Sequence, residues 1–222
     1  VSIGKNIISD VNHKSIVFDQ EQYSHVGFFK HSKNHNNTAY EIFTQDGPLA
    51  VLPSPSTKKN KSTFIYTSRK KIDTNLLQKF IHKKFEKSHG KLMFDKSISK
   101  FPITPHLTKN NKNFIYVGDS LKSIHPVAGQ GWNLGIKDIK TLCKLLDQYS
   151  LEEKSFNSYY YSRRIIESTI YFSFTSILNY LYENNSAFNN KIIKIGYSGL
   201  KKIKIFRDIF IKQAMGRINL TG

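Results

Sequence analysis

One glycine-rich run, from Gly118 to Asp138, constrains the fold of this chain more than any other stretch. It follows the short apolar segment Phe114–Val117 and leads into an amphipathic stretch that begins near Ile139. This order predicts a strand, an acidic turn, a glycine-rich loop and then a helix. Backbone N–H groups at such a helix start favour anionic or electron-rich ligand atoms. The carboxylate of Asp119, at the end of the strand, can accept hydrogen bonds from ligand hydroxyls.

Composition limits the classes of protein to which the chain can belong. Its 222 residues, 39% of them hydrophobic, suit one large domain or parts of two. The formal net charge of +18 would suit an anionic membrane or nucleic acid. However, Lys is spread along the chain and only five of the 34 basic residues are Arg, so we favour a genomic bias and rank nucleic acid last. The densest basic zone, 191–212, alternates Lys with apolar residues, which is typical of an amphipathic helix on a membrane or acidic partner.

Several common kinds of site are not predicted. Cys143 is the single cysteine, so no disulfide can form within the chain, and its leucine neighbours predict a buried packing residue rather than a nucleophile. His31 and His35 lie four apart in a strand-to-loop stretch, where this spacing gives no shared helical face, and we expect no metal. No apolar run approaches the roughly 18 residues of a membrane-spanning helix. The start, residues 1–4, has no signal-peptide pattern.

The order of predicted elements indicates an α+β or α/β fold in three regions. Residues 1–111 are expected to form a mixed-sheet substrate domain, with a helix at 76–87 and strands near 23–30, 39–44, 49–52, 63–67 and 97–104. Residues 112–150 are expected to add the strand, the loop and a helix over 130–148, as one segment of a Rossmann-like domain. Residues 151–222 are expected to be helical, with a long first helix, a break at 184–186, and helices over 187–198 and 203–214.

The glycine-rich run resembles the second flavin-binding motif of the flavoprotein aromatic hydroxylases, the p-hydroxybenzoate hydroxylase-like group. The similarity rests on Gly118-Asp119, Pro126, the Gly129-Gln130-Gly131 triplet, Asn133 and Asp138. Three other stretches resemble the ubiquinone-biosynthesis hydroxylase branch, in matching order: Ala39–Pro53 with its Gly-Pro-Leu-Ala hairpin, Phe174–Tyr182, and Phe210–Gly216 with Gln-Ala-Met-Gly. The similarity therefore extends over essentially the whole chain.

The resemblance implies a monooxygenase that uses FAD, NAD(P)H and dioxygen to hydroxylate a polyprenylated phenol or quinol. It places Asp119 at the FAD ribityl chain, Pro126 and the glycine triplet against the isoalloxazine ring, and Asn133 at the pyrimidine edge. It identifies no acid or base, so the catalytic residues stay unknown. The cofactor-binding residues that it implies are Gly118, Asp119, Pro126, Gly129, Gln130, Gly131, Trp132 and Asn133.

The resemblance covers only the C-terminal half of such an enzyme. The family begins with a strand–Gly-x-Gly-x-x-Gly–helix unit for the ADP half of FAD, and neither this unit nor the middle Asp-Gly motif is present. We therefore expect the chain alone to bind FAD weakly or not at all. Lys122 departs from the family pattern, and we expect its charge near the FAD phosphates. A lipid-tailed substrate implies a cytoplasmic protein with peripheral contact to the inner membrane face or to a ubiquinone-biosynthesis complex.

Two other interpretations stay open. Another flavoprotein of the same superfamily, a reductase or a halogenase, would share the glycine-rich run. A halogenase Trp-x-Trp-x-x-Pro motif is missing, because Trp132 is the only tryptophan. A basic membrane-binding or nucleic-acid-binding module would explain the charge, but it would leave the run from Gly118 to Asp138 without a purpose.

Overall fold

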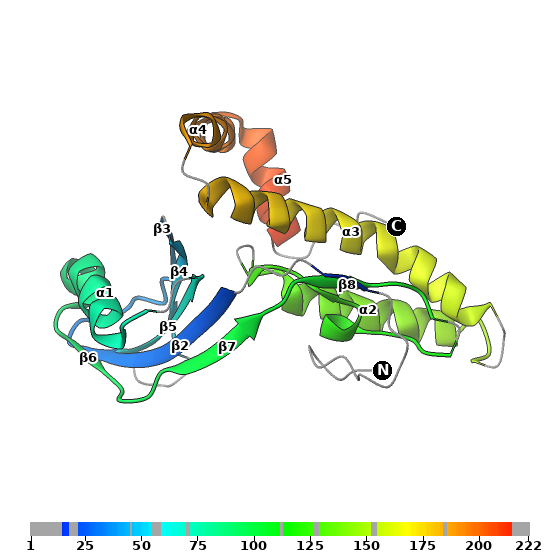
Figure 1. Cartoon of the computed structure of the whole chain (residues 1–222), viewed down its shortest axis with the longest axis horizontal. Coiled ribbons are helices and arrows are strands. Elements are labelled where there is room, and N and C mark those ends of the chain that lie inside the picture. Colours follow the sequence, from blue (N-terminus) through cyan, green and yellow to red (C-terminus); the bar gives the residue numbers. More distant parts are fainter. Residues whose placement is uncertain are drawn as a thin grey trace. The chain divides into compact units, whose positions relative to one another are not determined.

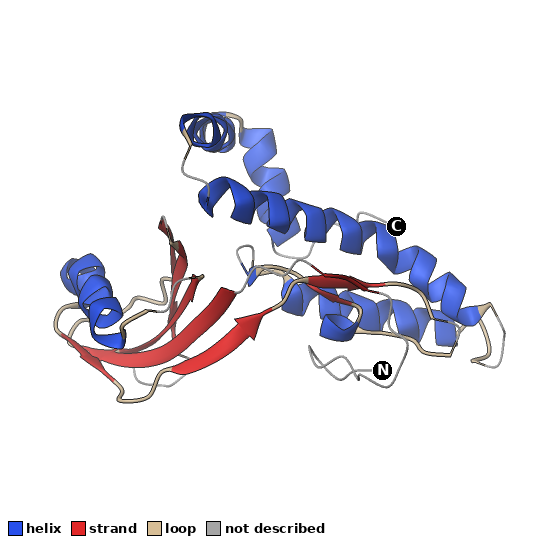
Figure 2. Cartoon of the chain, viewed as in Figure 1, coloured by secondary structure: helices blue, strands red, loops and turns tan. Residues whose placement is uncertain are grey.

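The computed structural model describes residues 15–17, 22–44, 46–54, 59–69, 72–111, 113–126, 129–151, 155–183 and 186–214. The chain folds into two compact units (Figure 1). One unit comprises residues 20–103, and the other combines residues 1–19 with 104–222. Strands dominate the first unit and helices the second, which confirms the predicted α+β fold class (Figure 2).

A six-stranded sheet forms the centre of the unit 20–103. Its order is β3-β4-β5-β2-β6, and β7 also pairs with β2. A mixed sheet was expected, but every described strand pair is antiparallel. Short connections join β3, β4 and β5, and a short connection can join only antiparallel neighbours. The strands are β2 (Gln22–His31), β3 (Tyr40–Thr44), β4 (Gly47–Pro53), β5 (Lys61–Ser68), β6 (Leu92–Phe94) and β7 (Ser99–Ile103).

Glycine is required where β4 begins. Gly47 has φ of 141°, in the region that side chains disfavour. A Cβ built at Gly47 would lie 1.9 Å from the carbonyl oxygen of Thr67, so only glycine lets the hairpin close against β5. This is the Gly-Pro-Leu hairpin singled out in the sequence, and it forms as predicted.

Helix α1 (Thr74–His89) supplies the rest of this unit's core. It begins at Asp73, whose carboxylate accepts a hydrogen bond from the Asn75 N–H at 2.7 Å, and it ends at Gly90, where φ is 75°. The predicted helix at 76–87 is therefore confirmed. Its apolar face packs with the sheet in one cluster, which includes Phe29, Leu49, Val51, Phe64, Leu77, Ile81 and Phe85.

The second unit combines a small sheet with a set of helices. The sheet has the order β1-β8-β9, built from β1 (Ser15–Val17), β8 (His106–Thr108) and β9 (Lys122–Ser123). The helices are η1 (Gly118–Ser120), α2 (Gly131–Leu146), α3 (Phe156–Glu183), α4 (Ala187–Lys202) and α5 (Lys204–Ala214). Of the helices described, none has both the length and the apolar character that crossing a membrane requires. Of the predicted break at 184–186, residues 184 and 185 lie outside the described residues, and Ser186 is the N-cap of α4.

The strand predicted at Phe114–Val117 does not form. The backbone is extended at Val117, with φ of −132° and ψ of 149°, but among the described strands none pairs with this segment. A β-strand needs a neighbouring strand to pair with its backbone N–H and C=O groups. The pattern of apolar residues in the sequence cannot reveal whether such a strand is present. Tyr116 instead packs in a cluster with Leu121, Leu145 and other residues of the unit.

The predicted burial of Cys143 is wrong, because the side chain is exposed. Helix α2 buries Leu134, Asp138 and Leu145. At 100° per residue, Cys143 lies on the opposite side of the helix from Leu145. Leucine neighbours in sequence therefore did not indicate which side of α2 is covered.

Candidate functional site

The Gly-Asp turn is attached to α2 through its backbone. Gly118 has φ of 59° and opens η1. Its N–H donates to the Oδ2 atom of Asp138 at 2.9 Å. A Cβ built at Gly118 would meet no atom within 4 Å, and the side chain of Asp119 is exposed. The turn therefore exposes the backbone of Gly118, with no side chain covering it, next to the carboxylate of Asp119. We call such an uncovered glycine backbone a bare glycine face.

A second glycine bend lies before α2. Gly129 also has φ of 59°, and its N–H donates to the carbonyl oxygen of Pro126 at 3.0 Å. A Cβ built at Gly129 or at Gly131 would meet no atom within 4 Å. Val127 and Ala128 lie outside the described residues. The glycines of this bend border open space, which leaves room for a ligand to approach the backbone.

The first turn of α2 carries the remaining predicted residues. The side-chain amide of Asn133 donates to the Oε1 atom of Gln130 at 3.0 Å, and Gln130 is buried. The Gln130 side chain makes no capping hydrogen bond to α2. Trp132 is 79% exposed, although it is the largest apolar side chain of the turn.

The fold brings the two predicted segments into one unit through α2. Asp138 of this helix binds the Gly118 N–H, and a Cβ built at Gly135 would lie 3.7 Å from the Gly118 Cα atom. The Gly-Asp turn therefore lies against the helix that begins at Gly131. The predicted site residues belong to two features that adjoin α2, the Gly-Asp turn and the bend before the helix.

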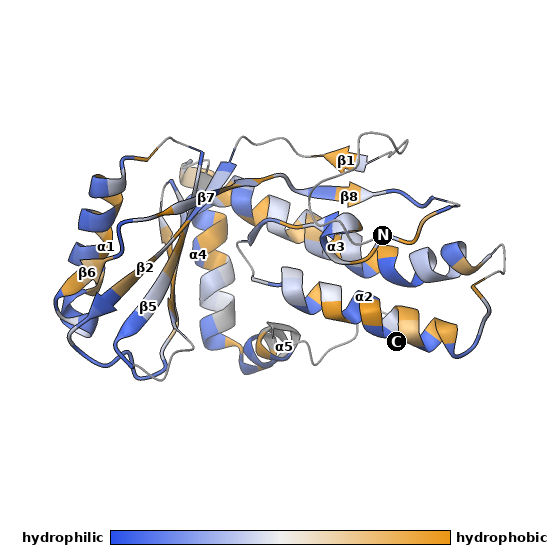
Figure 3. Cartoon of the chain, turned by 90° about the horizontal axis from the view of Figure 1, so that it is seen from below, coloured by the Kyte–Doolittle hydropathy of each residue, from blue (hydrophilic) through white to orange (hydrophobic). Residues whose placement is uncertain are grey.

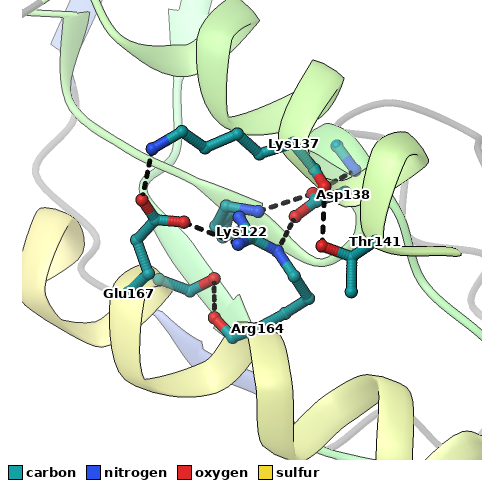
Figure 4. A network of polar contacts seen from close by, with 8 residues as sticks. Lys122, Lys137, Asp138, Thr141, Arg164 and Glu167 are labelled. Atoms are coloured by element: carbon teal, nitrogen blue, oxygen red, sulfur yellow. Dashed lines mark hydrogen bonds and ion pairs between the residues drawn. The ribbon is translucent and has the colours of Figure 1, made fainter. Parts of the chain in front are cut away.

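A buried network of charges lies behind these loops (Figure 4). Asp138 accepts from Lys122 Nζ at 2.5 Å and from Arg164 Nε at 2.7 Å. Glu167 accepts from Arg164 Nη1 and from Lys137 Nζ, both at 2.6 Å. These side chains come from β9, α2 and α3, so the network ties the Gly-Asp turn and α2 to the long helix.

Burial and pairing shift the pKa values within the network in different directions. Burial lowers the pKa of Lys122, although the carboxylate of Asp138 opposes the shift. Burial would raise the pKa of Glu167, but hydrogen bonds and charges from Lys137 and Arg164 outweigh it, and the pKa lies below its usual range. Three cations thus face two carboxylates, an arrangement that is stable only while the pairs stay intact.

Lys122 is not placed as expected. It was expected near FAD phosphates, yet it is 3% exposed and its ammonium group binds Asp138. One sequence signal could have indicated the network. Asp138 lies four residues after Leu134 and seven before Leu145, which puts a charge on the buried face of α2.

Comparison with known proteins agrees with this architecture. Ubiquinone hydroxylase UbiL of Rhodospirillum rubrum is 25% identical over 86% of this chain and 47% of its own length. The 3-demethoxyubiquinol 3-hydroxylase of Escherichia coli is 26% identical over 81% of this chain and 49% of its own length. The chain thus spans about half the length of these curated relatives, and the resemblance to ubiquinone-biosynthesis hydroxylases is confirmed.

Solved structures and a family model complete the comparison. The p-nitrophenol 4-monooxygenase PnpA of Pseudomonas putida DLL-E4 superposes with a TM-score of 0.70 at 12% identity, over 96% of this chain and 57% of that one. The Diels-Alderase PyrE3 superposes with a TM-score of 0.67 at 12% identity, over 94% of this chain and 46% of that one. The family model described as squalene epoxidase matches residues 50–196, about two thirds of the sequence. The chain therefore belongs to the squalene epoxidase family.

Proposed function

We propose that this chain is the C-terminal portion of a flavin-dependent monooxygenase that hydroxylates the aromatic ring of a polyprenylated phenol or quinol in ubiquinone biosynthesis. The observation that carries the proposal is the pair of bare glycine faces, at Gly118 and at Gly129–Gly131, beside the start of α2. In this proposal residues 1–111 act as the substrate domain, 112–150 as part of the FAD domain, and 151–222 as a helical region. Residues 1–19 and 104–111 belong to the same compact unit as the last two regions, so the sheet of residues 20–103 forms the body of the substrate domain. A dinucleotide-binding half completes the enzyme, since the relatives are about twice as long.

FAD would be held by the two glycine features. Asp119 accepts hydrogen bonds from the ribityl hydroxyls, and Gly118 lets them approach. Gly129 and Gly131, which border open space, would let the isoalloxazine ring approach the backbone, and Pro126 would lie against the ring. When bound, FAD supplies the oxygen-transfer chemistry, with NAD(P)H as reductant and dioxygen as co-substrate.

The start of α2 has an electrostatic role in this proposal. Its N-terminal N–H groups and positive dipole end would favour negative charge on the pyrimidine side of a bound flavin ring. Gln130 and Asn133 hold each other, which orients the Asn133 amide at that edge. Trp132 extends from the same turn, and its exposed indole would cover the ring.

The substrate suggests where the protein works. A polyprenyl tail partitions into membranes, so the protein is cytoplasmic with peripheral contact to the inner membrane face or to a ubiquinone-biosynthesis complex. Nucleic acid is not a partner in this proposal.

Titration with FAD tests the site. Trp132 is the only tryptophan of these 222 residues, so in this chain quenching of its fluorescence reports binding beside the glycine bend. In the complete enzyme, equilibrium dialysis followed by flavin absorbance measures binding. We expect tight binding by the enzyme that includes the dinucleotide-binding half, and weak or no binding by these 222 residues alone. Gly129→Val should weaken binding by the complete enzyme at least tenfold, because a branched side chain is strained at φ of 59° and projects toward the ring. Tight binding that is unaffected by Gly129→Val would contradict the assignment.

Product analysis tests the reaction. The complete enzyme, supplied with NAD(P)H and labelled dioxygen, should place one labelled oxygen atom on the ring of a polyprenylated phenol. Reduction of the prenyl chain or halogenation of the ring would instead assign the protein to another branch of the superfamily.

A further inference from the structure

The sheet of residues 20–103 has one covered face and one open face. Side chains alternate between the two faces along each strand, and Phe29, Leu49 and Phe64 lie in the core cluster that α1 covers. Helix α1 is the one helix that the structure describes in this unit (Figure 1). Both hydrophobic and hydrophilic residues occur along these strands (Figure 3). The sequence neighbours of the core residues therefore belong to a second face, which α1 does not cover.

This open face is mainly apolar. Ala50, Ile65 and Val26 lie in one row across β4, β5 and β2, and they are half-buried. Four larger apolar side chains of the same face are between 38% and 52% exposed. An aromatic ring can therefore lie on this face in contact with apolar groups. The four side chains are Phe28, Phe43, Leu52 and Phe101.

Glu41 is the one acidic residue among the described strand residues of the open face. Tyr40 and Ile42 pack against the core, so Glu41 between them belongs to the opposite face. It lies across from Ala50, at the end of the apolar row. Its carboxyl has no hydrogen bond or ion pair with any residue that the structure describes. Both carboxyl oxygens are therefore available to a ligand.

The surroundings of Glu41 favour a neutral ligand that donates a hydrogen bond. The side chain is exposed, so a ligand can reach it, but the neighbouring strands withdraw enough water to raise the pKa of its carboxyl. No charge contributes to this shift, because Lys61 and Lys30 pair with each other at the far end of the face, four residues along the strands from Ile65 and Val26. Apolar surroundings also disfavour a charged amine as the ligand. A phenolic hydroxyl on an aromatic ring meets both requirements.

We propose that Glu41 binds the ring hydroxyl of the substrate and accepts its proton while the ring is hydroxylated. This inference rests on the proposed function and deepens it, since it assigns the proton acceptor that the sequence motif did not identify. It uses none of the predicted flavin-binding residues.

The proton transfers balance over the reaction. The oxygen atom and the electrons come from dioxygen and NAD(P)H, as proposed above. Electrophilic oxygen adds to a ring carbon ortho or para to the hydroxyl, the hydroxyl becomes a carbonyl, and its proton passes to the Glu41 carboxylate. The ring carbon then loses its own proton to water, and the carbonyl oxygen regains a proton from Glu41. The ring is aromatic again with one C–H bond replaced by C–OH, and Glu41 returns to its starting state.

Three variants separate the possible roles of Glu41. Glu41→Gln keeps the size of the side chain and a hydrogen-bond acceptor but cannot take up a proton. Glu41→Leu removes both abilities. Glu86→Gln is the matched control, because Glu86 is exposed on α1, the helix that covers the other face of the sheet. Thermal unfolding should confirm that all three variants fold.

Steady-state kinetics of the complete enzyme with a geranylated phenol test the proton transfer. Glu41→Gln should lower kcat at least tenfold and change the Kd of the phenol less than threefold. In the unaltered enzyme kcat should fall as the pH drops through the pKa of Glu41, because the carboxylate is the acceptor, and this loss should be absent in Glu41→Gln. Glu86→Gln should stay within twofold of the unaltered enzyme. An unchanged kcat, or the same loss at low pH in Glu41→Gln, would overturn the proposal.

Binding without reductant tests the contact independently of the reaction. By equilibrium dialysis, the unaltered enzyme should bind the geranylated phenol at least tenfold more tightly than its methyl ether, which has no proton to donate. Glu41→Leu should bind the two compounds within twofold of each other. Equal binding of both by the unaltered enzyme would overturn the proposal. An enzyme that shows this preference but adds no oxygen to the ring would instead contradict the proposed function and leave the Glu41 contact standing.

Discussion

Removal of the Asp138 carboxylate should destabilise the unit that contains the proposed flavin site. Asp138 is 0% exposed and accepts from Lys122 Nζ, Arg164 Nε and the Gly118 N–H. Asp138→Ala leaves two buried cations without their shared anion. Removing one partner of a buried ion pair costs about 3–5 kcal/mol, and we expect a value near the upper end because two cations are affected.

The corresponding change in melting temperature is large. For a chain of this length each kcal/mol corresponds to roughly 2–4 °C, so the expected shift is on the order of 10 to 20 °C. Urea titration followed by far-UV circular dichroism measures the loss, because the network joins two long helices, α2 and α3. Adding Lys122→Met to Asp138→Ala should recover part of the stability, since one unpaired buried cation is then removed.

A second aspartate on α2 serves as the control. Asp147 is exposed at the C-terminal end of the helix, where a negative charge gains nothing from the helix dipole. Asp147→Ala should therefore change the unfolding free energy by less than about 0.5 kcal/mol. If Asp138→Ala cost no more than Asp147→Ala, the network would not be the buried and paired structure described above.

Three further outcomes are expected. Gly129→Ala should cost about 1 kcal/mol in urea titration because of its φ of 59°, and Gly129→Asn should cost less, since Asn tolerates that region. Burial, with His31 and His35 nearby, lowers the pKa of His89 to about 4. Above pH 6.5, the pKa of the unfolded state, the ring is neutral in both states and the folded protein keeps its full stability. Up to about 3 kcal/mol of unfolding free energy should be lost as the pH falls from 6.5 to 4. His89→Phe should make the unfolding free energy depend less on pH over this range. Cys143 should react with a thiol reagent in the folded chain nearly as fast as in urea, and slow reaction would contradict its exposure.

Local chemistry in the sequence predicted much of the structure. Asp73 and Gly90 mark the ends of α1, and the expected helix at 130–148 appears as α2 at 131–146. The glycines at 118 and 129 adopt the positive φ that only glycine adopts readily. Membership of the family could also be predicted, because the residues of the motif are close together in sequence.

The sequence by itself determined where helices and turns begin, because capping residues, glycines and apolar spacing act over a few neighbouring positions. Only the tertiary structure decided which surfaces are covered. Lys122 and Cys143 were both misplaced, one expected at a ligand and the other in the core. Asp138 and Arg164 are 26 residues apart, and their ion pair exists because α2 and α3 pack together. Burial and pairing of charges depend on such distant neighbours, which no local pattern records.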